Sequence, residues 1–118
     1  MYILGCVGET NSKYYTGSTV RALLDRFREH VAGKCRWTAA FKEVHLLVAW
    51  EVPAEHVRAV EVYLKRHARA RADIVTGKDS LRVANFHAWL QDHAIPWRRV
   101  PATELQAVEV AARTGGIA

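Results

Sequence analysis

Residues 1–18 constrain the fold of this chain more than any other segment. Two runs rich in strand-forming residues, MYILGCV (1–7) and YYTGS (14–18), are separated only by GETNSK, a cluster of turn residues. A connection this short joins antiparallel strands, because a parallel pair needs a crossover of a dozen or more residues. The sequence therefore predicts a β-hairpin at its start.

The hairpin carries a tyrosine on each strand. If Gly8 and Glu9 form a two-residue turn, counting back along the strands places Tyr2 opposite Tyr15. Any register of the same parity leaves both rings on one face of the sheet, because side chains alternate between faces. Gly17 needs a separate explanation, since glycine inside a strand weakens it and has no side chain to pack.

After the hairpin the periodicity becomes helical. The pattern predicts a helix over 20–32, with Thr19 or Ser18 as its N-cap. Asp25 and Glu29 lie opposite the apolar arc, while Arg26 and His30, four residues apart, share one edge of it. The arc itself consists of Val20, Leu23, Leu24, Phe27 and Val31.

The rest of the chain alternates one apolar strand with helices. Pro53 ends the strand and opens the next helix, whose buried stripe is expected to contain Val57, Val60, Leu64 and Ala68. Gly77 marks a break. The expected elements are a strand over 44–52, helices over 54–72, 80–93 and 103–113, and a loose end over 114–118.

This order predicts an α+β fold. The expected core is a three-stranded antiparallel sheet flanked by helices in the order ββαβαα, followed by a short helical C-terminal extension. At 118 residues, half of them hydrophobic, the chain suits a single compact domain.

Charge and cysteine content narrow the functional classes. Seventeen Lys and Arg outnumber twelve Asp and Glu, and the pI near 9.6 suits a surface that meets phosphates. Cys6 and Cys35 lack the CxxC spacing of zinc sites and are expected to be reduced thiols. The chain contains neither an apolar run of membrane-spanning length nor a signal-peptide pattern, so we predict a soluble, cytoplasmic protein.

Glu61 falls about 40° from Val57 on the helical wheel, at the border of the buried stripe. It has two interpretations. It is either an edge carboxylate paired with Arg58 or Lys65, or a ligand for a hard divalent cation such as Mg²⁺, which often takes only one or two protein carboxylates.

Four other polar residues have similar alternatives. Arg26 and His30 are either a solvated helical flank or site residues, and Tyr2 and Tyr15 are either half-buried strand tyrosines or site residues. Together with Glu61, they come from different elements and are all able to face one concave surface. The combination favours a catalytic site.

Five segments in this order resemble the GIY-YIG nuclease superfamily, in particular small single-domain members similar to the Slx1-type catalytic domain. The resemblance covers residues 1–75, which it identifies as the nuclease core, with 76–118 as a helical extension packed on that core. The segments are MYIL and YYTGST for the two tyrosine motifs, RFREH for the helix arginine and histidine, HVAGKCRWT for the following loop, and AVEVYLK for the glutamate helix.

The resemblance implies a metal-dependent phosphodiesterase. Glu61 would hold Mg²⁺ or Mn²⁺, which polarises the phosphate and stabilises the leaving 3′ oxygen. Arg26 would stabilise charge on the non-bridging oxygens. Gly17 would let the backbone pass close to DNA or to the first helix.

The resemblance also implies that a tyrosine removes a proton from the attacking water. Tyr2 is the first choice for this base and Tyr15, expected to point into the site, is the second; either needs a pKa well below the usual ~10. The cation that lowers this pKa would be His30, Lys13 or Lys65. His30 alternatively hydrogen-bonds a tyrosine or the scissile phosphate.

Contacts with DNA are expected from basic residues around the site. Trp37 either stacks on an unpaired base, which would favour single-stranded or branched substrates, or anchors the core. The expected basic contacts are Lys34 and Arg36 in the loop and Lys65, Arg66 and Arg69 at the end of the second helix, where the alternative is a solvated helix end.

Three functions remain open at this point. The first is a magnesium- or manganese-dependent DNA endonuclease that serves repair, the processing of branched or single-stranded DNA, or mobile-element work. The second is a nucleic-acid-binding module that keeps the fold with weak or no turnover. The third is a nuclease subunit that needs a protein partner.

Overall fold

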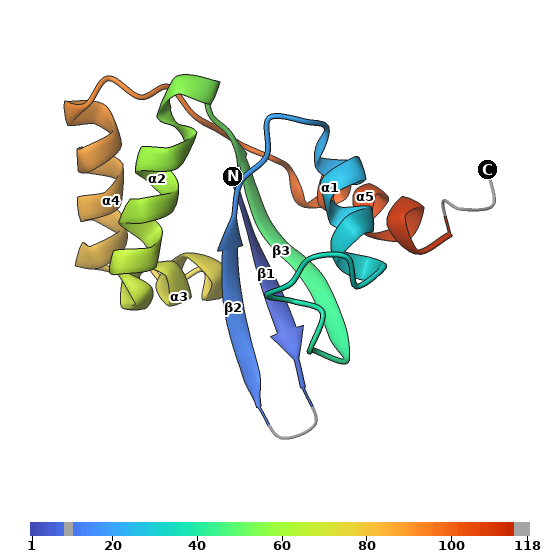
Figure 1. Ribbon diagram of the computed structural model, residues 1–118. Coiled ribbons are helices and arrows are strands. Elements are labelled where there is room, and N and C mark those ends of the chain that lie inside the picture. The colour runs from blue at the N-terminus through green and yellow to red at the C-terminus, as the bar shows by residue number, and fades with distance from the viewer. Residues whose placement is uncertain (9–10, 115–118) are drawn as a thin grey trace.

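A computed structural model describes residues 1–8 and 11–114 of the chain. Its elements are β1 (Tyr2–Val7), β2 (Ser12–Gly17), α1 (Leu23–Val31), β3 (Glu43–Glu51), α2 (Ala54–Arg66), α3 (Ala68–Thr76), α4 (Leu81–Asp92), β4 (Arg98–Arg99) and α5 (Ala102–Thr114). Figure 1 shows the sheet at the centre, with α2, α3 and α4 on one side and α1 and α5 on the other. The predicted α+β class is confirmed.

The sheet has four strands in the order β2-β1-β3-β4, all antiparallel, so the prediction of three strands is corrected. In β4, Arg98 and Arg99 pair with Glu51 and Trp50. Arg98 also donates two hydrogen bonds to the Glu51 carboxylate, at 3.0 and 2.6 Å. Two residues are too few for an alternating pattern, so no sequence signal marks this strand.

The register of the hairpin differs from the predicted one by two residues. Tyr2 lies opposite Gly17, and Tyr15 lies opposite Leu4. Val7 pairs with Ser12, which leaves four residues between the strands instead of two; the predicted Gly8–Glu9 turn lies partly outside the described residues. A shift of two preserves parity, so the two tyrosines share a face as predicted, with ring centroids 6.5 Å apart.

Each face of the sheet carries its own buried cluster. Ile3, Val48 and Trp50 pack against residues of α2 and α4, including Leu64 and Phe86. On the other face, the cluster formed by β1, β3, α1 and α5 contains Tyr2, Leu4, Cys6, Phe27, Ala49 and Leu105. The helices of residues 81–114 thus contribute to both clusters.

The first helix is shorter than predicted. It begins at Leu23, after Ala22, and neither Ser18 nor Thr19 caps it. The Thr19 hydroxyl instead accepts a hydrogen bond from the Arg21 amide at 3.0 Å. Such local bonding competes with helix formation, and it leaves Val20 82 % exposed outside the apolar arc.

The predicted helix over 54–72 is two helices. His67 has φ −118° and ψ 64°, which ends α2, and its ring hydrogen-bonds the Tyr63 carbonyl at 2.8 Å. Ala68 is consequently exposed instead of belonging to the buried stripe. The new direction of α3 brings Arg71 to β2, where it donates a hydrogen bond to Thr16 at 2.9 Å.

The predictions for the last two helices are confirmed. Ser80 caps α4 by accepting a hydrogen bond from the Val83 amide, and Gly77 ends α3 with φ +75°. Trp97 packs on Trp50, with ring centroids 6.2 Å apart, so the segment after α4 covers the end of the sheet. The predicted loose end falls mostly on residues 115–118, which lie outside the described part of the chain.

None of the helices within 1–8 and 11–114 is long and apolar enough to cross a membrane.

Candidate active site

Gly17 makes room for the phenol of Tyr2. The two residues face each other across the first strand pair, and a Cβ added at Gly17 would lie 2.6 Å from the Tyr2 hydroxyl oxygen, well inside van der Waals contact. The atoms that need this space belong to Tyr2, whereas the sequence suggested DNA or the first helix. Tyr2 is 1 % exposed.

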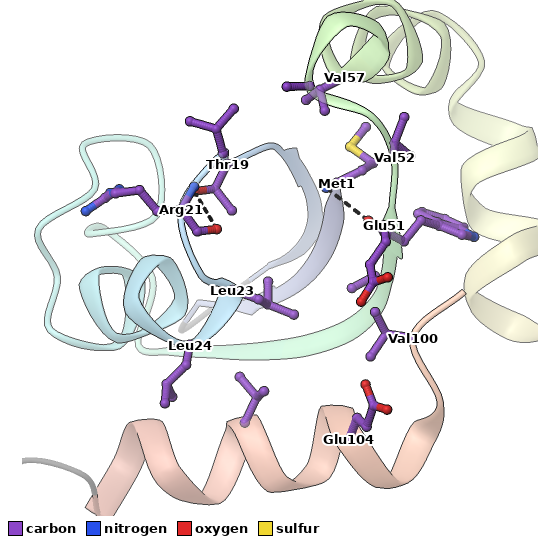
Figure 2. A pocket seen from close by; sticks show the side chains of 15 residues that line it. Met1, Thr19, Arg21, Leu23, Leu24, Glu51, Val52, Val57, Val100 and Glu104 are labelled. Atoms are coloured by element: carbon purple, nitrogen blue, oxygen red, sulfur yellow. Dashed lines mark hydrogen bonds between the residues drawn. The ribbon is translucent and has the colours of Figure 1, made fainter. Parts of the chain in front are cut away.

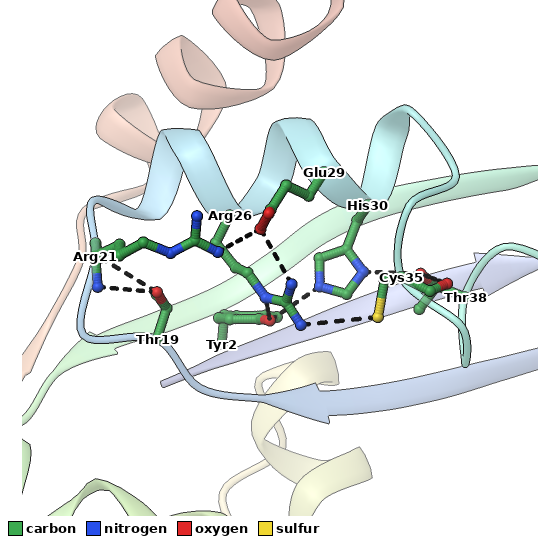
Figure 3. Close-up of polar contacts among 8 residues, drawn as sticks. All are labelled: Tyr2, Thr19, Arg21, Arg26, Glu29, His30, Cys35 and Thr38. Atoms are coloured by element: carbon green, nitrogen blue, oxygen red, sulfur yellow. Dashed lines mark hydrogen bonds and ion pairs between the residues drawn. The ribbon is translucent and has the colours of Figure 1, made fainter.

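A chain of hydrogen bonds runs from α1 through Tyr2 to the following loop (Figure 3). Arg26 Nε donates to the Tyr2 hydroxyl at 3.2 Å, and the same oxygen lies 2.9 Å from His30 Nε2. His30 Nδ1 in turn lies 2.8 Å from the Thr38 hydroxyl. Arg26 and His30 reach one tyrosine because they are four residues apart on a helix.

The partners of Thr38 indicate where the protons lie. The Thr38 hydroxyl is placed to donate to the Cys35 carbonyl at 3.5 Å, which leaves its oxygen free to accept from His30 Nδ1. His30 Nε2 is then the ring acceptor, and the Tyr2 hydroxyl donates to it. His30 is therefore a buried hydrogen-bond partner of a tyrosine, one of the roles predicted for it, and the solvated flank is excluded because only 2 % of His30 is exposed.

Both tyrosines have raised pKa values, so the expected lowering is wrong. Burial raises the pKa of Tyr2, although the hydrogen bond and charge of Arg26 oppose the shift. Burial also raises the pKa of Tyr15 to about 12, with a further contribution from Cys35. Desolvation disfavours the charged phenolate more than one arginine stabilises it.

His30 cannot serve as the cation that was expected to lower these values. Burial, together with the positive charge of Arg26, lowers its pKa from the ordinary 6.5 to about 4. His30 is thus neutral at neutral pH. Its ring centroid lies 5.6 Å from that of Tyr2 and 5.4 Å from that of Tyr15, so both tyrosines surround a neutral imidazole.

This neutral histidine predicts a pH dependence of folding. Because the folded pKa of His30 lies below the unfolded one, its contribution to stability is present above pH 6.5 and is lost as the pH falls toward 4. Between pH 7 and pH 4 the wild-type free energy of unfolding should fall by about 3 kcal/mol more than that of His30→Gln. Urea unfolding of both proteins at several pH values measures the difference; parallel pH profiles would contradict it.

Arg26 has two further neighbours that the sequence did not indicate. Its Nη1 donates to Glu29 at 3.1 Å, and its Nη2 lies 3.8 Å from the Cys35 sulfur. Glu29 also pairs with Arg21. The sequence placed Glu29 on the solvated side of the helix, but the i,i+3 spacing from Arg26 was a usable signal. A phosphate at Arg26 would have to compete with this carboxylate.

Glu61 approaches the same region from α2. Its carboxylate lies 3.5 Å from the hydroxyl of Ser18, which follows Gly17 directly, and 3.6 Å from Lys65 Nζ. Only 17 % of its side chain is exposed. The pairing with Lys65 is one of the two interpretations from the sequence, but both contacts are long and leave carboxylate lone pairs free. Besides burial and Cys35, the negative charge of Glu61 also raises the pKa of Tyr2, although by less than either of them, and Arg26 opposes the shift. Glu61 and Tyr2 therefore interact.

The carboxylate of Glu61 is an oxygen donor of the kind that hard divalent cations prefer. Among residues 1–8 and 11–114, no group of three or more His, Cys, Asp or Glu side chains is arranged to hold a metal ion. Mg²⁺ or Mn²⁺ held by one carboxylate, waters and a phosphate needs no such group. The single carboxylate of Glu61 therefore fits the predicted metal.

Comparison with known protein families decides the relationship of this chain. The family model of the GIY-YIG catalytic domain matches residues 1–74, well over half of the chain. The chain belongs to the GIY-YIG family. The match confirms the resemblance found in the sequence and identifies a nuclease domain. No curated protein and no solved structure matches the chain significantly. The similarity to the Slx1-type subgroup stays a prediction.

The expected DNA-contacting residues of this GIY-YIG domain lie on its surface. Trp37 is 70 % exposed, which excludes the alternative of a core anchor, and the Arg36 guanidinium lies 5.6 Å from its ring centroid. Lys65 and Arg66 end α2, whereas Arg69 belongs to α3 because of the break at His67. Lys34, Arg36, Lys65, Arg66 and Arg69 are all exposed.

A separate pocket of about 560 Å³ opens between α1, α5 and the end of β3 (Figure 2). Its walls are mainly apolar and include Leu23, Val52, Val57 and Val100. The five predicted catalytic residues are not among those that line it. This pocket is therefore not the candidate active site of the GIY-YIG domain.

Proposed function

We propose that this chain is a metal-dependent DNA endonuclease that hydrolyses phosphodiester bonds in branched or single-stranded DNA. We further propose that it is a cytoplasmic protein. The observation that carries the proposal is the Tyr2 hydroxyl held between Arg26 Nε and His30 Nε2, in a chain whose residues 1–74 match a GIY-YIG catalytic domain. A phenol between a cation and a neutral imidazole is equipped both to accept and to pass on a proton.

Tyr2 acts as the general base through His30. Because its pKa is raised, the phenol does not exist as a free phenolate at neutral pH. It takes a proton from water as its own proton moves to His30 Nε2, and the water oxygen bonds to phosphorus while the P–O3′ bond breaks. The leaving 3′ oxygen takes a proton from solvent to become a hydroxyl, and His30 returns its proton to solvent. A bound phosphate raises the proton affinity of His30, because negative charge favours the imidazolium.

Arg26 and Glu61 bind the phosphate group and the metal. Arg26 stabilises the charge that grows on the non-bridging oxygens. Glu61 would hold Mg²⁺ or Mn²⁺, and the ion would supply Lewis-acid polarisation of the phosphate. Tyr15, whose ring lies beside His30, completes the site and limits access of water to the imidazole.

A second candidate is a partner-dependent or catalytically weak domain that mainly binds nucleic acid. This candidate is favoured because the charged groups of the site are already paired within the protein. Arg26 pairs with Glu29, and Glu61 pairs with Lys65. Tyr2 is 1 % exposed, so Arg26 or another neighbour would have to move before water reached the Tyr2 hydroxyl. A protein partner that orders the substrate would drive that movement.

Cleavage of a DNA panel tests the proposed function. End-labelled single-stranded, duplex, flap and junction DNAs are incubated with wild-type protein in Mg²⁺, Mn²⁺ or chelator, with single-stranded RNA as a control. We expect products with 3′-hydroxyl and 5′-phosphate ends in either metal and none in chelator. Failure to cut any DNA in either metal would reject the enzyme and leave the second candidate.

A further inference from the structure

A second pocket, of about 360 Å³, opens beside the candidate active site and has a different lining. It brings together aromatic rings and lysines from β2, the loop before β3, and α2. The residues that line it include Lys13, Tyr14, Tyr15, Trp37, Phe41 and Lys65. We call this cavity the aromatic pocket.

Two residues connect the aromatic pocket to the site. Tyr15 lines the pocket, and its ring centroid lies 6.5 Å from that of Tyr2. Lys65 also lines the pocket and pairs with Glu61 at 3.6 Å. A nucleotide in the pocket would therefore neighbour a phosphate bound between Arg26 and Glu61.

The chemistry of the lining selects a flat, anionic ligand. Trp37 is 70 % exposed and Tyr14 is 37 % exposed, although burial would stabilise such rings. Exposed aromatic rings beside lysines are the means by which proteins stack single-stranded bases and bind the attached phosphates. The volume is that of a small-ligand site, which suits one nucleotide unit.

The faces of a base in a duplex are covered by its neighbours and its edge is paired, so it enters a pocket only when unpaired. We propose that the aromatic pocket binds one unpaired nucleobase of a DNA substrate, stacked on Trp37, next to the phosphate that is cleaved. This inference rests on the proposed function for the position of the phosphate. It assigns the selection of branched or single-stranded DNA to Trp37 and Tyr14, and the charge contact to Lys13 and Lys65.

Binding in chelator tests the pocket without cleavage. Fluorescence anisotropy compares a labelled duplex that carries one unpaired thymidine with the same duplex fully paired. Trp37→Ala should weaken binding of the unpaired substrate by about 5- to 150-fold, as expected for the loss of one base–aromatic stack, and barely change binding of the paired one. Trp37→Phe should restore most of the preference, and an abasic residue in place of the thymidine should abolish it in the wild type.

Lysine variants separate stacking from charge. Lys13→Gln should weaken binding of both duplexes similarly and reduce the salt dependence by about one phosphate contact. Lys78→Gln removes an exposed charge two residues after the end of α3 as a matched control, and we expect it to change neither the affinity for the two duplexes nor the salt dependence.

The outcomes distinguish this inference from the proposed function. The aromatic pocket would be overturned if the wild type bound the two duplexes with equal affinity or bound no DNA. It would also be overturned if Trp37→Ala lost the same affinity for both duplexes. If the preference depends on Trp37 but the wild type cuts no DNA in Mg²⁺ or Mn²⁺, the pocket stands and the endonuclease does not. If the wild type cuts DNA but Trp37→Ala does not change the preference for the unpaired substrate, the endonuclease stands and the aromatic pocket does not.

Discussion

Replacing Glu61 with glutamine is expected to reduce DNA cleavage by at least about 10³-fold, because several kcal/mol of transition-state stabilisation depend on the metal that its carboxylate would bind. Glutamine has nearly the same shape but no charge, so the fold and the affinity for DNA should hardly change. Glu61→Ala should give the same loss. Gel-based cleavage rates in Mg²⁺ and anisotropy in chelator measure the two properties separately.

Glu55→Gln is the matched control for this change. Glu55 lies in the first turn of the same helix, its side chain is 78 % exposed, and its carboxylate lies 3.5 Å from His56 Nε2. Its cleavage rate should equal that of the wild type. If Glu61→Gln cuts as fast as the control, the carboxylate is only the partner of Lys65 and the proposed metal site is wrong.

Gly17→Ala should impair both folding and cleavage. The added methyl group meets the buried Tyr2 ring at 2.6 Å, so the ring or the edge strand must move. Overpacking of this kind costs about 1–3 kcal/mol of the free energy of unfolding. Displacement of the Tyr2 hydroxyl from Arg26 and His30 should reduce cleavage by about 10²-fold, a usual cost of misplacing a reacting group by 1 Å.

Gly5→Ala, on the neighbouring strand, provides the comparison. The three atoms nearest to a Cβ at Gly5 all belong to the Leu47 side chain, the closest at 3.1 Å, and that flexible end is able to turn away. Chemical denaturation and cleavage assays of both variants should show a much larger effect at Gly17. Tyr2→Phe should match Gly17→Ala in lost cleavage; a Tyr2→Phe protein with normal cleavage would remove Tyr2 from the mechanism.

The sequence was most informative where local periodicity governs structure. Alternation along the strands placed Tyr2 and Tyr15 on one face, and helical spacing placed Arg26 and His30 together. The helices at 81–92 and 102–114 were predicted from their periodic patterns and from the glycine and proline residues that bound them. These features depend on residues close together in the chain, which a single sequence displays directly.

Other features had no local signal. The two-residue strand of Arg98 and Arg99 exists because Glu51 lies beside it. The helix break at His67 interrupts a pattern that reads as continuous. The signs of the tyrosine pKa shifts were wrong because the sequence shows which charges are near but not how much water is excluded.

The sequence by itself determined the α+β class, which follows from the order and periodicity of the elements, and the family, which follows from the resemblance of its motifs to GIY-YIG nucleases. Only the tertiary structure decided that Gly17 accommodates the Tyr2 ring, that Thr38 holds His30, and that Trp37 and Lys65 share one pocket. Each of these depends on the distance between segments remote in the chain. Burial then sets the protonation of the groups that meet there.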